Sequence, residues 1–142
     1  MFFKDLVERF NIRNIPLLDA LKEKIFSSFS LKYSLTSFYR HYKDKFPFSK
    51  DSLFSYFKYF LESMLVFEVR KFSESSYQRL RNPAKIYLID PGLAKKVASS
   101  DSGRLLENVV YLELMRRYND IFYFENKGEC DFVVKAEDGW AV

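Results

Sequence analysis

The strongest constraint on the fold is a series of three helix-start signals in the first half of the chain. Asn14, Ser34 and Ser49 each precede a stripe of apolar residues at helical spacing, and Pro16 follows the first of them closely. Short polar side chains cap the free N–H groups of a first helical turn, where proline is also tolerated. The three stripes are Leu17, Leu18, Leu21, Ile25 and Phe26, then Leu35, Phe38, Tyr39, Tyr42 and Phe46, then Leu53, Phe57, Phe60, Leu61 and Met64. This spacing predicts three helices between residues 16 and 64, the second of them ended by Pro47.

A strand–loop–strand pattern follows the helices. Residues 65–69 and 85–89 are mostly apolar, and the segment between them is polar and basic, which predicts a long hairpin. Residues 31–33 alternate and predict a very short additional strand. The order helix, short strand, helix, helix and hairpin is that of the winged helix-turn-helix. On this interpretation the third helix is the recognition helix and the loop at residues 77–82 is the wing.

The remainder of the chain predicts an α/β unit. We expect a helix at residues 92–98, a linker at 99–103 and a strong helix at 104–118, whose apolar residues lie nearly all round and favour burial on more than one side. Strands are predicted at residues 121–124 and 130–134. A third strand begins at Trp140, after the hairpin signal Asp138-Gly139. We therefore expect a mixed α+β or α/β chain that ends in an unfinished αβββ unit.

Charge divides the chain in the same way. Residues 1–90 hold 16 basic and 10 acidic side chains, a net charge of +6, whereas residues 91–142 hold 7 and 9, a net charge of −2. The first part is therefore the better candidate for contact with a polyanion. A solvated basic surface without a ligand is an equally open alternative.

The sequence does not contain the residues that several functional classes require. A single cysteine, Cys130, and a single histidine, His41, exclude an internal disulfide framework and a Cys/His zinc site. None of the four glycines belongs to a phosphate-binding loop motif. No apolar run is long enough to span a bilayer, and the N-terminal residues do not resemble a secretory signal. We therefore expect a cytoplasmic chain without membrane contact, without a cofactor of its own and without catalytic residues.

Three stretches of the sequence resemble recurring segments of a large prokaryotic family. They are NPAKIYLIDPGL at residues 82–93, GRLLENVVYLEL at 103–114 and GECDFVVK at 128–135, with a further likeness in DLVERFNIRN at 5–14. Together they are similar to the C-terminal half of predicted AAA-type ATPases of archaea and bacteria. In that family a nucleotide-binding domain precedes a winged-helix segment and an uncharacterised C-terminal domain. The resemblance implies a linker helix at residues 1–14, a winged-helix-like domain at 15–90 and a partial nuclease-like domain at 91–142, with the ATP site upstream of Met1.

The resemblance also implies that the C-terminal part is similar to the restriction-endonuclease-like, PD-(D/E)xK fold. There a helix acid, a strand acid and a Glu/Gln-x-Lys pair on the next strand surround a magnesium ion. Glu107 matches the helix acid and Asp131 the strand acid, while the last pair would fall beyond Val142. Structural alternatives stay open, because Glu107 suits a first helical turn and Asp131 alternates on a strand and can face water.

These observations lead to three hypotheses. The first is a non-catalytic module that binds or positions DNA for an upstream ATPase domain, the second is a module that docks a protein partner or that domain, and the third is part of a metal-dependent nuclease. For the first hypothesis, cationic and polar side chains of the third helix would meet the DNA groove, and those of the hairpin would contact phosphates. The candidates are Lys50, Ser52, Ser55, Lys58 and Tyr59 on the helix, and Lys71, Arg79, Arg81 and Lys85 on the hairpin.

Overall fold

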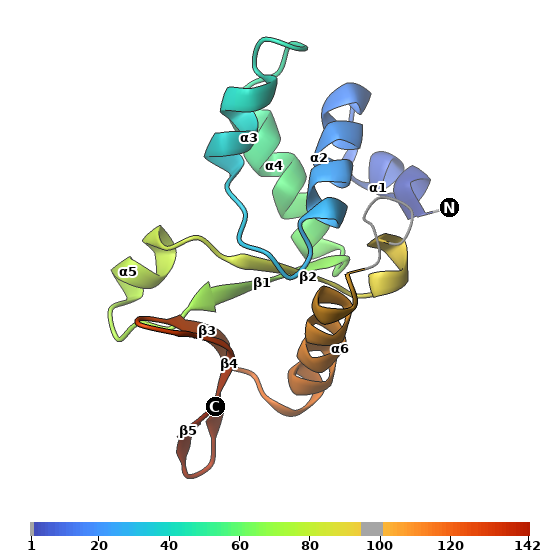
Figure 1. The fold of residues 1–142 in the computed structure, drawn as a ribbon. Coiled ribbons are helices and arrows are strands. Elements are labelled where there is room, and N and C mark those ends of the chain that lie inside the picture. Colours follow the sequence, from blue (N-terminus) through green and yellow to red (C-terminus); the bar gives the residue numbers. More distant parts are fainter. Residues whose placement is uncertain (1, 95–100) are drawn as a thin grey trace.

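Polar caps open the three helices that the sequence predicts. In the computed structural model, which describes residues 2–94 and 101–142, Asn14, Ser34 and Ser49 each accept a hydrogen bond from the backbone N–H three residues later, at 3.1–3.2 Å. The helices that follow are α2 (Ile15–Ser27), α3 (Leu35–Tyr42) and α4 (Lys50–Glu62). Helix α1 (Phe2–Phe10) precedes them, and its Leu6 is buried in their shared core. The predicted caps are therefore confirmed. Figure 1 shows the four helices on one side of the β1–β2 strands.

Five strands form one mixed sheet in the order β2-β1-β3-β4-β5. Strand β1 (Val66–Lys71) pairs antiparallel with β2 (Lys85–Leu88) along its first four residues, which confirms the predicted hairpin. Its last two residues pair in parallel with β3 (Ile121–Glu125). Strands β4 (Glu129–Ala136) and β5 (Gly139–Ala141) then continue the sheet in antiparallel fashion. The sheet thus contains strands from both sides of the domain boundary predicted at residue 90.

Contacts from two other segments of the chain cover the outer edge of β2. The segment predicted as a very short strand lies there, where Ser30 N–H donates to Ile86 O and Ile86 N–H donates to Leu31 O. Only isolated bridges form, between Phe29 and Ile86 and between Lys32 and Lys85. Further along the edge, the buried Asn108 amide donates to Leu88 O at 2.8 Å and accepts from Leu88 N–H at 2.9 Å. The side chain of Asn108 therefore replaces a missing strand at Leu88.

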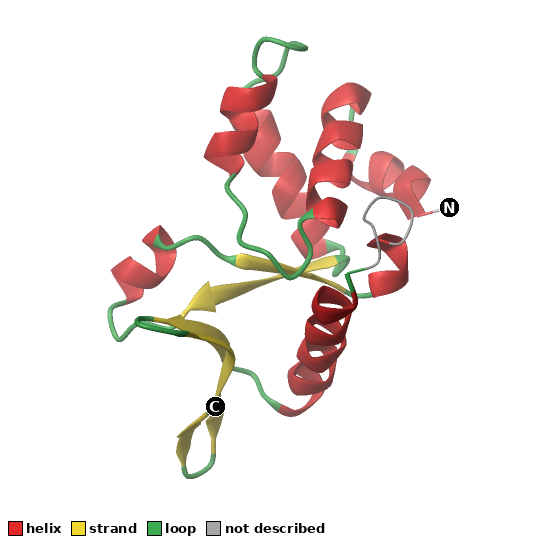
Figure 2. Cartoon of the chain, viewed as in Figure 1, coloured by secondary structure: helices red, strands yellow, loops and turns green. Residues whose placement is uncertain are grey.

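Two apolar clusters lie on the two faces of the hairpin. Ile86 and Leu88 face α1–α4 and join the larger cluster, which includes Leu17, Leu21, Leu53 and Phe60. Tyr87 points to the opposite face, as alternation along a strand requires, and packs with Val69, Tyr111 and Tyr123. Helix α6 (Ser102–Arg117) lies across this second face (Figure 2). The hairpin is therefore the middle layer between the N-terminal helices and α6.

Two sequence expectations differ from the structure. The predicted wing loop contains a short helix, α5 (Ser76–Arg81), which Ser75 caps. Helix α6 is not buried on more than one side, because Leu106, Val109 and Val110 are 40–65% exposed. Its apolar residues surround the helix, but only one face meets the sheet.

Two remaining expectations concern the connection before α6 and the membrane. A 3-10 turn at Pro91–Ala94 lies at the start of the helix predicted for residues 92–98, and the rest of that helix is outside the described residues. Among the described helices, none combines the length and the apolar character needed to cross a membrane.

Replacing Asn108 should destabilise the fold strongly. Asn108→Ala leaves the buried N–H and C=O of Leu88 without these partners, which costs about 3 kcal/mol of unfolding free energy. Urea denaturation followed by circular dichroism measures this loss. The control is Asn119→Ala, at an exposed asparagine just after α6, which should change stability by less than about 0.5 kcal/mol. Equal effects of the two variants would contradict the edge-covering role.

Candidate functional site

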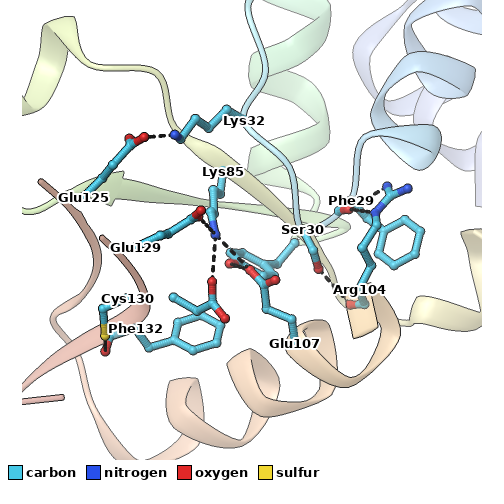
Figure 3. A network of polar contacts seen from close by, with 12 residues as sticks. Phe29, Ser30, Lys32, Lys85, Arg104, Glu107, Glu125, Glu129, Cys130 and Phe132 are labelled. Atoms are coloured by element: carbon cyan, nitrogen blue, oxygen red, sulfur yellow. Dashed lines mark hydrogen bonds and ion pairs between the residues drawn. The ribbon is translucent and has the colours of Figure 1, made fainter. Parts of the chain in front are cut away.

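The ammonium group of Lys85 lies among three carboxylates. Lys85 is the first residue of β2, and its side chain is only 4% exposed. Its Nζ lies 3.1 Å from Glu107 Oε1 of α6, 2.8 Å from Glu129 Oε1 of β4 and 3.2 Å from Asp131 Oδ1 of β4. In Figure 3 the labelled Glu107 and Glu129 point toward this nitrogen. We call the set of Lys85, Glu107, Glu129 and Asp131 the Lys85 centre.

Strand and helix geometry explain this convergence. Glu129 and Asp131 both reach this nitrogen from β4, where the register with β3 is irregular between Phe122 and Phe124. Lys85 and Tyr87 share a face of β2, because they are two residues apart on a strand. Helix α6 crosses that face and turns Glu107 toward it, where Tyr87 Oη donates a hydrogen bond to Glu107 Oε1 at 2.6 Å. The centre therefore depends on three elements that are distant in sequence.

Charge neutralisation keeps Lys85 protonated. Burial alone would lower the pKa of Lys85, but its hydrogen bond to Glu129 and the negative charge of Glu107 outweigh burial and raise the pKa. Burial also raises the pKa of Tyr87, with help from its hydrogen bond to Glu107, so Tyr87 stays a neutral donor. One ammonium opposite three carboxylates leaves a net charge of −2 when all are ionised.

The centre is open to solvent on one side. The Glu107 side chain is 16% exposed, whereas those of Glu129 and Asp131 are 48% and 53% exposed. Lys85 is therefore held at the base of the centre and the β4 carboxylates at its rim. Such an arrangement holds the carboxylates in fixed positions and presents negative charge outward.

The two predicted metal ligands do meet, but around an ammonium. Glu107 and Asp131 both contact Lys85 Nζ, which lies between them. Within residues 2–94 and 101–142 no group of three or more His, Cys, Asp or Glu side chains has the geometry of a metal site. As placed, the side chains fit an ammonium ion pair and do not fit a magnesium ion.

The structure corrects one residue of the predicted DNA surface and gives another an aromatic partner. Lys85 does not reach outward as a wing cation, because it is buried in the carboxylate centre. Tyr59 is half-buried on α4, and its ring stacks on Phe10 of α1 with centroids 4.3 Å apart, so its contact with DNA stays a prediction. Both residues were assigned from their position in the sequence, which does not reveal the partner across the fold.

The other predicted contacts on α4 lie partly or fully at the surface. Lys58 is exposed and pairs with Glu62 at 3.6 Å, and Lys50 lies over the ring of Tyr39. Ser52 and Ser55 are half-buried, and Ser52 accepts a hydrogen bond from the capping Ser49 hydroxyl.

Two of the predicted cations of the hairpin line one groove. Lys71 and Arg81 line it together with Phe72, Ser73, Tyr77, Gln78 and Asn82. Arg79 donates a hydrogen bond at 2.7 Å to the backbone oxygen of Ser73, a residue of the groove, which fixes the loop before α5. The groove therefore combines two cations with amide and hydroxyl groups.

Sequence reasoning did not identify Glu129 and Tyr87 as parts of the site. Glu129 is two residues from Asp131, and Tyr87 is two residues from Lys85. This spacing is typical of side chains on one face of a strand. That signal alone does not say which strands meet, so it gave no site.

Comparison with known proteins identifies the family. Residues 3–104 match the model of a family described as a domain of unknown function, DUF8612. The chain belongs to this family. The DUF8612 match includes α1–α5, the hairpin and Lys85, and it ends within the first turn of α6, before the three acids of the Lys85 centre.

One relative of the DUF8612 chain is an archaeal protein. The uncharacterized protein MJ1544 of Methanocaldococcus jannaschii is 30% identical over 145 residues, and the match covers 97% of this chain. It covers 32% of the archaeal protein, so the chain spans about a third of that relative's length. No solved structure matches the chain significantly.

Removing the central cation should destabilise the protein in a pH-dependent way. Lys85→Met leaves three carboxylates close together, and we expect a loss of about 3 kcal/mol of unfolding free energy at pH 7. Because the folded-state pKa of Lys85 is raised, its stabilising effect is complete below the unfolded pKa of about 10.4 and is lost as pH rises toward the folded pKa. The difference between Lys85→Met and the unmodified protein should therefore shrink above about pH 10.4.

Urea denaturation at pH 7, 9 and 11 measures this difference. Lys135→Met is the control, because Lys135 is an exposed lysine of the same β4 strand. The double variant Lys85→Met/Glu107→Gln should recover part of the loss by removing one unpaired charge. Equal stability of Lys85→Met and Lys135→Met would refute the ion-pair role.

Proposed function

We propose that this chain binds and positions duplex DNA within a longer protein, through α2–α4 and the β1–β2 hairpin. The observation that carries the proposal is the basic groove at the end of the hairpin, lined by Lys71 and Arg81. Residues 70–82 hold four basic side chains and one acidic one, Glu74. This concentration of charge suits the phosphate backbone, which attracts cations whatever the base sequence.

The arrangement of the elements supports a winged-helix interpretation. Three helices precede a hairpin, and the segment at residues 29–33 contacts the outer edge of β2. In this proposal α4 approaches a groove of the duplex with Lys58, while Lys71 and Arg81 contact phosphates from the hairpin. Phosphate contacts of this kind fix the position of the DNA and leave base recognition to other groups.

The family resemblance suggests what the positioned DNA is for. If the longer protein carries an ATPase domain, that domain would supply ATP-driven movement while this chain holds the duplex. The Lys85 centre would then serve as a structural joint between hairpin, α6 and β4. A nuclease role for Glu107 and Asp131 stays a prediction, and in the structure both acids pair with Lys85.

A protein-docking role is the second candidate, and the exposed face of α6 favours it. Leu106, Val109 and Val110 together leave an apolar surface open. Apolar surface of this kind is typical of contact with another protein or domain. Association through this face would be insensitive to salt, which separates the second candidate from the first.

Duplex affinity should fall with salt, and the double variant Lys71→Ala/Arg81→Ala should make this dependence weaker. Each lost phosphate contact reduces the slope of log K against log salt by about 1, so a change of about 2 is expected. Fluorescence anisotropy with a labelled duplex at several salt concentrations measures the slope.

A matched pair of single variants tests the α4 contact. Lys58 and Lys4 are both exposed and both form an i,i+4 pair with a glutamate. Lys58→Ala should weaken duplex binding, whereas Lys4→Ala on α1 should leave it nearly unchanged. Unaltered salt slopes in the hairpin variant, or equal effects of the two single variants, would count against the proposal.

A further inference from the structure

Three aromatic side chains form a surface cluster at the far end of the hairpin. Trp140 of β5 lies edge-to-face with Phe72, at a centroid distance of 4.8 Å, and with Phe122 of β3, at 5.7 Å. Phe72 and Phe122 also contact each other at 5.9 Å. Unlike the core rings of Tyr87 and Phe60, Trp140 is 49% exposed. We call Trp140, Phe72 and Phe122 the aromatic platform.

The aromatic platform is continuous with the basic groove. Phe72 belongs to both, because it also lines the groove beside Lys71 and Arg81. The guanidinium of Arg79 lies 5.8 Å from the centroid of the Phe122 ring. The cations of β1 and α5 therefore lie beside Phe72 and Phe122, the two rings that contact Trp140.

This combination selects a particular kind of polyanion. An exposed aromatic ring stacks on nucleobases of any sequence, and nearby cations attract the phosphates that connect them. Paired bases in a duplex present no open face, because each is stacked on its neighbours. The platform therefore suits unpaired nucleotides, whereas a purely electrostatic surface would not need the rings.

We propose that the aromatic platform binds single-stranded nucleic acid, with an unpaired base stacked on Trp140 and neighbouring phosphates at Lys71 and Arg81. The inference rests on the proposed function for its choice of a nucleic acid and deepens it by naming an unpaired strand as the ligand of this surface. Lys71 and Arg81 would then serve two ligands in turn, a duplex together with α4 and an opened strand together with the platform.

The single tryptophan of the chain makes the proposal directly testable. Trp140 is the only tryptophan, so its fluorescence reports on the platform alone. Titration with an oligothymidylate of about 12 nucleotides, within the usual site sizes for such surfaces, should quench this fluorescence in a saturable way. A duplex of the same length should quench it far less.

Variants separate stacking from charge. Trp140→Ala should lower the affinity for the labelled oligothymidylate roughly tenfold, as expected for one lost stacked base, whereas Trp140→Phe should keep most of it. Leu80→Ala is the control, because Leu80 is a 71% exposed apolar residue of α5 outside the platform. Circular dichroism melting of each variant verifies that it is folded.

The outcomes distinguish this inference from the proposed function. Loss of oligothymidylate binding in Trp140→Ala with unchanged duplex binding supports the platform. Absence of quenching, or equal affinity of Trp140→Ala and the unmodified chain, overturns it even if duplex binding follows the expected salt dependence. Equal quenching by polyglutamate also overturns it, because an acidic protein segment would then be the better ligand.

Discussion

The ion pairs of Lys85 are the interaction on which the rest of this structure depends. A buried ammonium is costly unless it is paired and hydrogen-bonded, and here its partners come from α6 and from β4. Strand β2 carries both Lys85 and Tyr87, and Tyr87 stacks on Tyr111 and donates a hydrogen bond to Glu107. Lys85 therefore determines how the helical part of the chain meets the C-terminal strands.

Much of the local structure could be predicted from the sequence because its causes are local. Caps at Asn14, Ser34 and Ser49 act on the next three residues, so the starts of three helices were predictable. The hairpin was predictable from two apolar runs around a polar segment. Asp131 remained open between a ligand and a solvent-exposed residue, and it is a half-exposed partner of Lys85.

The candidate site was less predictable because it depends on contacts between distant segments. Lys85 follows several basic residues, so its position in the sequence favours a surface role, and only the crossing of α6 over β2 brings Glu107 to it. The apolar residues of α6 presented the same difficulty. Periodicity identifies the faces of a helix, but it does not tell how many of them find a partner. Glu107 and Asp131 were singled out as metal ligands and Lys85 as a phosphate contact, but the ion pairs that join them were not predicted.

The divided pairing of β1 has a consequence for the order of folding. Its first four residues pair with β2 across the loop that contains α5, whereas Arg70 and Lys71 pair with Phe122 and Tyr123, roughly 50 residues further along the chain. Closing the longer loop carries the larger entropy cost, so the distant pairing should form after the hairpin. Until then, the backbone N–H and C=O groups at the end of β1 form a template for pairing that no strand has filled. A nascent chain emerging from the ribosome would expose that template to any other extended segment nearby.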